Sequence, residues 1–367
     1  MSTTVSSPRP GTPQPAGTDA GAAALSAKPV GWKTPVLLAA FGLVALVFFG
    51  FLAPNQTASF GISTGEDFFQ LPALAVNAFA GGMVLSVLML GLAGYAVYLK
   101  TKDRPAPGWL PVTFIVLFVA AFLIWVVGGA RTPSISLAGL IAGSVTLAVP
   151  LVFGSLSGVL CERVGVVNIA IEGQLLGGAF TAAIVASMTQ NPFIGLLAAA
   201  VAGALVSMVL ALFSIKYLVN QIIVGVVLNV LVSGVTGFLF STVMQEDSER
   251  FNSPPGLEAI EIPVLSSIPV IGPILFRQSL VGYLMYIAVL VVWVGLFKTR
   301  WGLRVRAVGE HPQAADTLGI NVNATRFWNV TLGGAVAGIG GSFFTLVAID
   351  SFTKEISGGR GFIALAA

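Results

Sequence analysis

The chain has 367 residues, of which 56% are hydrophobic and only 9% are charged. Soluble domains carry about 25% charged residues, so this composition excludes an ordinary soluble protein and indicates an integral membrane protein. The net charge of +3 comes from lysines and arginines whose positions follow membrane topology, so nucleic-acid binding is not expected.

The first 34 residues are rich in Pro, Ser, Thr, Gly and Ala and lack a hydrophobic pattern. We therefore expect residues 1–34 to be a disordered tail. A spanning helix needs about 20 mostly apolar residues, and charge-free runs of that length recur from Pro35 onward. They predict an all-α polytopic membrane protein with nine spans, centred near residues 44, 86, 120, 148, 178, 204, 231, 288 and 338.

Spans one to three, within residues 35–135, form an N-terminal transmembrane block, and residues 136–367 form a second block. Residues 189–192 (Thr-Gln-Asn-Pro) are the predicted turn between spans five and six. The second block contains pairs of glycines four residues apart, at Gly154 and Gly158, Gly173 and Gly177, and Gly334 and Gly338. Such pairs either allow close helix packing or arise by chance among 43 glycines.

Lysine and arginine positions predict the orientation. With a cytoplasmic N-terminus, 13 of the 18 basic residues fall inside, as the positive-inside rule requires. The remaining five are placed outside: Arg131, Arg250, Arg277, Lys354 and Arg360. This orientation makes the loop 298–326 cytoplasmic and the loop 246–277 external, where it either meets a partner or is a solvated connector.

The loop 298–326 contains its own short helix. Pro312 suits a first helical position and Gly319 a left-handed C-cap, so we expect two turns of helix over Pro312–Leu318. Ala314 and Ala315 would keep its surface low, and Ala315 is expected to face a docking protein. The alternative is a basic loop that only maintains the topology.

Polar residues interrupt two of the spans. They are Asn168, Glu172, Gln174, Asn220, Gln221 and Asn229. Glu172 is expected about one and a half turns into span five, where a charge costs roughly 2.5–3.5 kcal/mol. Gln221 and Asn229 can share one helix face. These side chains either line or gate a solute pathway, or they order a broken helix and bridge helices.

Several ordered motifs resemble ABC importer permeases of the nucleoside and simple-sugar uptake group. Residues 160–173 (LCERVGVVNIAIEG), 220–223 (NQII), 307–320 (AVGEHPQAADTLGI) and 358–367 (GGRGFIALAA) carry the similarity, together with Asn229. The resemblance covers residues 136–367 and implies that this block is the permease core, with residues 298–326 as its cytoplasmic coupling loop. The residues that it implies for coupling to an ATPase are Gly309, Glu310, Pro312, Ala314, Ala315, Asp316 and Gly319.

The resemblance also implies the partners. The chain has no P-loop motif, so ATP hydrolysis is expected on a separate ABC ATPase subunit. A second permease (a copy or a paralogue), an extracytoplasmic solute-binding protein or lipoprotein, and the lipid membrane would complete the complex. We expect a multi-pass protein of a bacterial plasma membrane. Relatives are expected to continue for about two further spans after Ala367, so we expect this chain alone not to transport.

The resemblance implies a nucleoside as the solute, followed by a monosaccharide such as ribose and then a branched-chain amino acid. A transport permease, not an enzyme, is expected: a single cysteine (Cys161) and a single histidine (His311) suggest no catalytic residue, metal site or cofactor. An ion-coupled secondary transporter is the alternative of a different class. It would use several intramembrane carboxylates, and only Glu172 is apparent.

Overall fold

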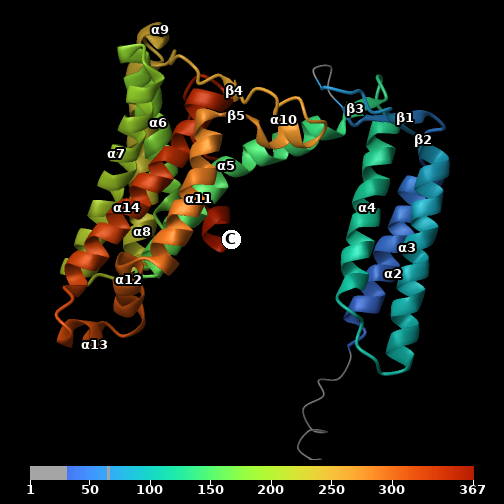
Figure 1. Ribbon diagram of the computed structural model, residues 1–367, viewed down its shortest axis with the longest axis horizontal. Helices are drawn as coiled ribbons and strands as arrows, with labels where there is room; N and C mark the ends of the chain where they lie inside the picture. Colours follow the sequence, from blue (N-terminus) through green and yellow to red (C-terminus); the bar gives the residue numbers. More distant parts are fainter. Residues whose placement is uncertain (1–30, 64–66) are drawn as a thin grey trace, which may run out of the picture. The chain divides into compact units, whose positions relative to one another are not determined.

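The structure is a computed structural model that describes residues 31–63 and 67–367. Disorder is expected for residues 1–34, and residues 1–30 of this tail lie outside the described part of the chain. Lys33 is already the first residue of the first helix. In the described part of the chain, nine helices are long and apolar enough to span a membrane, which confirms the predicted nine-span all-α architecture. The chain divides into two units (Figure 1). The first unit consists of the chain up to Phe60 together with Leu74–Ser134, and the second consists of Gly61–Ala73 together with Ile135–Ala367.

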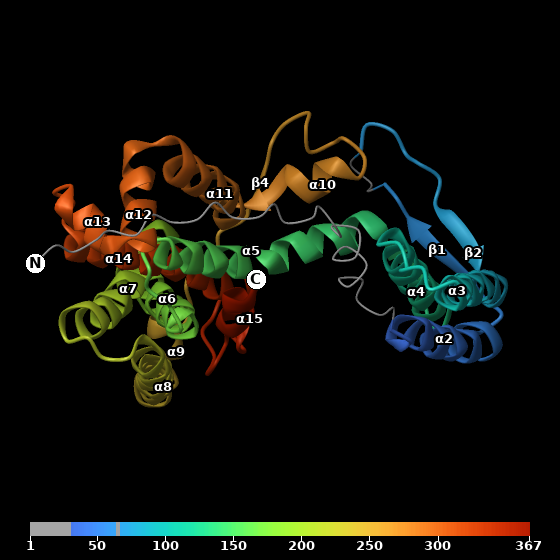
Figure 2. The same cartoon turned by 90° about the horizontal axis from the view of Figure 1, so that it is seen from below.

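The first unit contains three long helices packed side by side (Figures 1 and 2). They are α2 (Lys33–Ala45), continued by the π-helical turn η1 (Leu46–Phe51), α3 (Ala78–Thr101) and α4 (Trp109–Gly128). Short strands that the sequence did not suggest are β1 (Thr57–Gly61), β2 (Leu74–Asn77) and β3 (Ser134–Ser136). Strand β1 pairs antiparallel with β2, with Thr57 opposite Asn77. Asn77 then caps α3 by accepting from the Ala80 N–H at 3.0 Å, so the pairing sets where this span begins.

The second unit holds the remaining six spans. They are α5 (Leu137–Glu162), α6 (Ile171–Thr189), α7 (Pro192–Ala211) with η2 (Leu212–Lys216), α8 (Gln221–Leu239) with η3 (Phe240–Met244), α11 (Leu280–Lys298) and α14 (Val322–Phe343) with η4 (Phe344–Ala348). Its shorter elements are α9 (Ser248–Phe251), β4 (Ala259–Glu261), α10 (Ile271–Leu275), β5 (Arg277–Ser279), α12 (Arg300–Glu310), α13 (Pro312–Thr317) and α15 (Arg360–Ala366). The predicted turn after Thr189 is confirmed.

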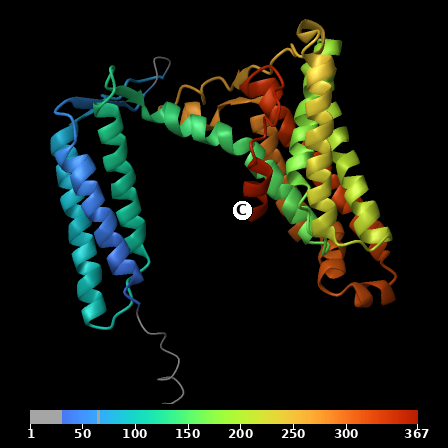
Figure 3. The same ribbon diagram turned by 180° about the vertical axis from the view of Figure 1, so that it is seen from behind.

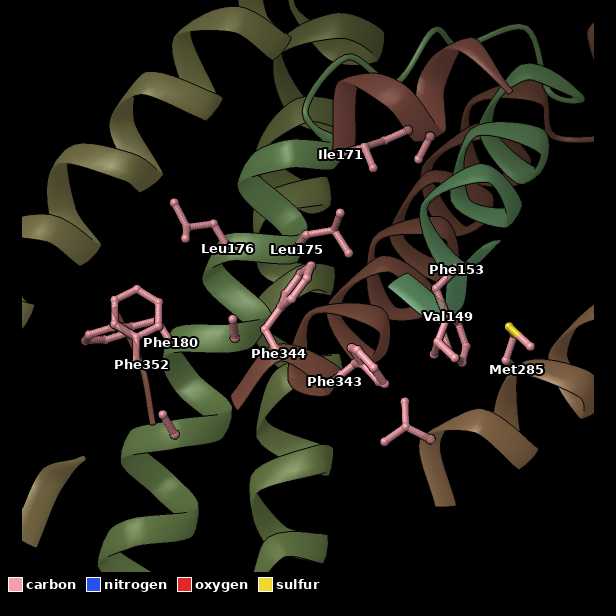
Figure 4. Close-up of a cluster of buried hydrophobic side chains, with 14 of the residues drawn as sticks. Val149, Phe153, Ile171, Leu175, Leu176, Phe180, Met285, Phe343, Phe344 and Phe352 are labelled. Atoms are coloured by element: carbon pink, nitrogen blue, oxygen red, sulfur yellow. The ribbon is translucent and has the colours of Figure 1, made fainter. Parts of the chain in front are cut away.

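Helices α6 and α14 form the centre of the second unit. The most apolar stretch of each is 72% buried, against 28% for each of the other spans in this unit. A cluster of apolar side chains fills the space around them, including Phe153, Leu175, Phe343 and Phe344 (Figure 4). These two helices are also the least apolar spans of the unit, with mean hydropathies of 1.3 and 1.6 against 2.0–2.5 for the others, because a helix surrounded by protein does not have to present an apolar surface to lipid.

Glycines set how closely the central helices approach. A Cβ on Gly338 would overlap the backbone of Ala199, and one on Gly203 would overlap the backbone of Gly334. The pair Gly334 and Gly338 is therefore a packing contact between α14 and α7 and not a chance spacing. By contrast, a Cβ on Gly158 would meet nothing closer than 3.7 Å, an ordinary contact.

The two ends of the second unit differ in structure. Helices α12 and α13 lie at one end of the long helices, and α9 lies at the opposite end (Figures 1 and 3). The loop 246–277, expected as a simple connector or partner surface, contains α9, α10 and strand β4, which pairs antiparallel with β5. The Arg277 guanidinium lies 3.0 Å from the Glu261 carboxylate across this pair.

Candidate functional site

The polar segment 298–326 is mostly helical. Thr299 caps α12 by accepting from the Gly302 N–H at 3.2 Å, and α12 buries Gly302, Val305 and Val308 on one face. The last span, α14, begins at Val322, capped by Asn321, so the predicted loop boundary at Arg326 is wrong by a full helical turn. Between α12 and α14 the segment forms one short helix, α13.

Helix α13 has the ends that the sequence predicted. Pro312 occupies its first turn, and Gly319 has a φ of +79°. The Gly319 N–H donates to Asp316 O at 2.9 Å and the Ile320 N–H to Ala315 O at 3.1 Å, the paired bonds of a Schellman motif. The α-helical residues end at Thr317, one residue before the predicted end, with Leu318 as the C-cap.

The orientation of α13 corrects one prediction. Ala315 is only 2% exposed, so it faces the chain's own interior and not a docking protein. Ala314 is exposed, and Leu318 is 80% exposed four residues later. Residues four apart lie on one helix face, so Ala314 and Leu318 form the outward apolar face of α13. Asp316 and Glu310 are exposed as well.

A groove of about 520 Å³ runs beside α13. Its lining residues are Pro312, Gln313, Asp316, Gly319, Ile320, Asn321, Val322 and Asn323. The wall combines one carboxylate, three side-chain amides and the exposed start of α14. Together with the outward face of α13, this groove gives the segment a surface with both an apolar projection and an adjoining polar recess.

The C-terminal end of α12, next to α13, contacts the turn that follows α5. A Cβ on Gly309 would overlap the carbonyl of Arg163, so the end of α12 lies directly against this turn. The Arg326 Nε donates to Val164 O at 3.1 Å from the first turns of α14. Gly165, with a φ of +78°, allows the turn. The predicted coupling residue Gly309 therefore makes close contact inside the chain, next to the segment 163–170.

The segment 163–170 joins α5 to α6 without helical structure and holds a closed polar network. Asn168 and Gln174 are both fully buried and exchange two amide hydrogen bonds of 3.0 Å. Asn168 also donates to Ser157 Oγ at 3.0 Å, and Gln174 donates to Ser207 Oγ at 2.8 Å. Among the alternatives for these two amides, this geometry favours ordering of a broken helix, because their polar atoms bind one another and not an open cavity.

Two polar residues of α8, Gln221 and Asn229, hold the same segment, while Asn220 caps the helix. Asn220 caps α8 by accepting from the Ile222 N–H at 2.9 Å. Gln221 accepts from the Val167 N–H at 2.6 Å, and Asn229 donates to Ile169 O and accepts from the Gly173 N–H, both at 2.8 Å. Gln221 and Asn229 thus share the face that meets the connection, as the spacing predicted.

Glu172 lies in the first turn of α6 and not one and a half turns inside it. Its carboxylate accepts three hydrogen bonds, from Ser357 Oγ at 2.6 Å, Gly359 N–H at 2.9 Å and Gly361 N–H at 2.6 Å. These bonds tie the segment before α15 to α6. The carboxylate is therefore satisfied within the chain, as the ordering alternative requires.

Helix α15 packs against α5. Ser155 Oγ of α5 donates to Ala364 O of α15 at 3.0 Å. Arg360, which is expected on the outer side of the membrane, is the first residue of this helix. The helix packs against α5 and α6, and Figure 1 marks the end of the chain part-way along the long helices.

Two of the predicted residues meet in a second groove. A cavity of about 600 Å³ lies between α6, α8 and the segment before α15. Its lining residues are Glu172, Leu176, Asn229, Val230, Ser233, Gly234, Glu355, Ser357, Gly358, Gly359 and Phe362. Glu172 and Asn229 belong to this groove, whereas Asn168, Gln174, Asn220 and Gln221 do not line it.

The sequence reading missed Glu355, Ser233 and Phe362. Glu355 stands in a polar stretch after the last span that resembles any external loop, and Ser233 and Phe362 stand in apolar runs. The one available signal was the Gly358-Gly359 pair, since consecutive glycines mark a sharp return of the chain.

Comparison with known proteins shows which proteins this chain resembles. A family model described as the permease component of a branched-chain amino acid transport system matches residues 140–367. The nucleoside ABC transporter permease protein NupC of Lactococcus lactis is 40% identical over 237 residues, which are 62% of this chain and 74% of that one. The guanosine ABC transporter permease protein NupQ of Bacillus subtilis is 38% identical over 235 residues, 62% of this chain and 73% of that one.

The putative glucose ABC transporter permease protein TsgC13 of Haloferax volcanii is 34% identical over 233 residues, covering 62% of this chain and 69% of that one. No solved structure matches the chain. The family model covers more than half of the chain, and its range contains both α13 and the groove beside Glu355. The chain therefore belongs to the family of branched-chain amino acid transport system permease components, and it is a multi-pass transport protein and not an enzyme.

Proposed function

We propose that this chain is the permease subunit of an ATP-driven importer of nucleosides. The observation that carries the proposal is the similarity to named permeases: NupC and NupQ, named for nucleoside and guanosine, are 40% and 38% identical over 237 and 235 residues, 62% of this chain in each case. A monosaccharide is the second candidate, because the glucose-named relative is 34% identical over the same share of the chain.

Docking of a separate ABC ATPase is the proposed role of α13. Pro312 and Gly319 fix the two ends of this short helix, while Ala314, Asp316 and Glu310 are exposed around it. Gly309 is in close contact with the turn at Arg163 and would transmit a movement of α13 to this turn. Ala315 contributes by packing α13 onto the chain. ATP binding would move this segment and thereby bias the core between outward-open and inward-open states.

The complex would also contain a second permease, identical or related, and an extracytoplasmic binding protein or lipoprotein that delivers the solute. We infer a plasma-membrane location in a bacterium with a cytoplasmic N-terminus. Support for this orientation comes from the end of the unit that carries α12 and α13, where Arg300, Arg304 and Arg306 gather.

Uptake into membrane vesicles tests the function. With the permease at the full length of its relatives, and with the ATPase, the second permease and the loaded binding protein present, we expect guanosine uptake that requires ATP on the ATPase side. Excess unlabelled nucleoside should compete, whereas ribose or leucine should not. Uptake that runs on a proton or sodium gradient without ATP would contradict the proposal, and competition by ribose alone would favour the sugar.

Cysteine labelling in intact cells tests the orientation. Ser248 and Gln313 are both exposed and lie in α9 and α13, at opposite ends of the second unit. Ser248→Cys should react with a membrane-impermeant maleimide, and Gln313→Cys should react only after permeabilisation. The parent is the control, since its one cysteine, Cys161, is fully buried. The reverse labelling pattern would invert the topology.

A further inference from the structure

Glu355 is an ionisable residue at the depth of the span centres. Its Oε1 accepts from Ser233 Oγ at 3.3 Å, and Ser233 lies near the middle of the 24-residue span Gln221–Met244. In the described part of the chain, Glu355 makes no salt bridge. Charged residues at this depth are costly, and they mark substrate pathways when they face a cavity. The Glu355 carboxylate faces the 600 Å³ groove.

The backbone holds this carboxylate in place. Glu355 has a φ of +55°, a left-handed conformation that is unfavourable for a non-glycine residue and is found more often at functional sites. The three hydrogen bonds that the Glu172 carboxylate accepts from Ser357, Gly359 and Gly361 keep the following turn in position. Glu172 is thus a positioning residue for the groove, while Glu355 has one bond within the chain and free acceptor capacity.

The remaining wall of the groove has two further chemical features. Phe362 is 50% exposed and presents an aromatic ring, whereas Leu176 and Val230 add apolar surface. Asn229 and Ser233 supply an amide and a hydroxyl on the opposite helix, α8. The volume lies within the range of small-molecule sites, about 300–1,000 Å³. An aromatic face together with a carboxylate fits a flat base joined to a sugar with vicinal hydroxyls.

We propose that this groove is the solute site within the membrane, where Glu355 accepts hydrogen bonds from the two ribose hydroxyls and Phe362 stacks on the base. The inference rests on the proposed nucleoside import and assigns that function its recognition residues. A carboxylate has two oxygens and can accept from both hydroxyls at once. The same charge would repel a nucleotide, so the site selects the uncharged nucleoside.

Direct binding to the purified permease and ATPase complex, without the binding protein, tests this site. The probes are tritiated guanosine and 2′-deoxyguanosine. The parent should bind guanosine about tenfold or more tightly, because the deoxy compound lacks one hydrogen bond to a charged acceptor. Glu355→Gln preserves size and the bond from Ser233, and it should reduce this ratio to below about threefold. Phe362→Leu should weaken both nucleosides equally and leave the ratio unchanged.

Glu258→Gln is the matched control, since Glu258 is an exposed carboxylate outside the groove and its loss should change neither affinity nor ratio. If Glu355→Gln retained the parent's ratio while the parent still imported guanosine with ATP, the site assignment would be wrong and the import function would stand. A parent complex that neither binds nor imports nucleosides would overturn both.

Discussion

Replacing Leu318 by glutamate should abolish recruitment of the ATPase while leaving the permease folded. Leu318 is 80% exposed at the C-cap of α13, beside the exposed Ala314, and a large apolar side chain in that position is available for burial by a partner. Leu318→Glu would bury an unpaired charge in the contact, which costs several kcal/mol. We expect co-purification of the ATPase, and ATP-dependent uptake with it, to fall by at least about tenfold.

The control for this experiment is Leu218→Glu. Leu218 is 83% exposed and lies near the start of α14, in a pocket with Asn323, but it is not part of α13. Both exposed substitutions should leave stability within about 0.5 kcal/mol. Full ATPase recruitment by Leu318→Glu, or an equal loss in both variants, would show that α13 does not make the specific contact.

Replacing Gly338 by valine should unfold or severely destabilise the second unit. Gly338 lies where α14 crosses α7, and its missing side chain leaves room for the backbones of Ala199 and Gly203. The valine side chain would overlap backbone atoms that cannot move without separating the helices. Overpacking of this kind costs about 1–3 kcal/mol and more where the backbone must shift. The expected result is a clearly lowered midpoint in denaturation by sodium dodecyl sulfate.

Gly237→Val provides the comparison. A Cβ on Gly237, on α8, would meet nothing within 4 Å, so the same substitution should leave the midpoint nearly unchanged. A midpoint close to that of the parent in both variants would mean that α14 and α7 do not approach closely at Gly338. An equal and large loss in both would mean that valine acts through helix propensity and not through the packing contact.

The sequence by itself determined the number and positions of the spans, because apolar runs of about 20 residues have one stable arrangement in a bilayer. It also determined the ends of α13, because Pro312 and Gly319 restrict the local backbone through their own covalent structure. The shared face of Gln221 and Asn229 followed from helical periodicity. Each of these depends on residues that are near one another in the chain.

Only the tertiary structure decided which way α13 turns and what the polar side chains contact. Ala315 is buried and Leu318 is exposed because α13 packs onto α12 and α14, and no local pattern in six residues fixes that rotation. Glu172 meets Gly359 and Gly361, and Glu355 meets Ser233, across more than 100 residues of sequence. Such pairs are created by the return of the chain after α14, since hydrogen bonds between distant segments leave no periodic signal in either segment.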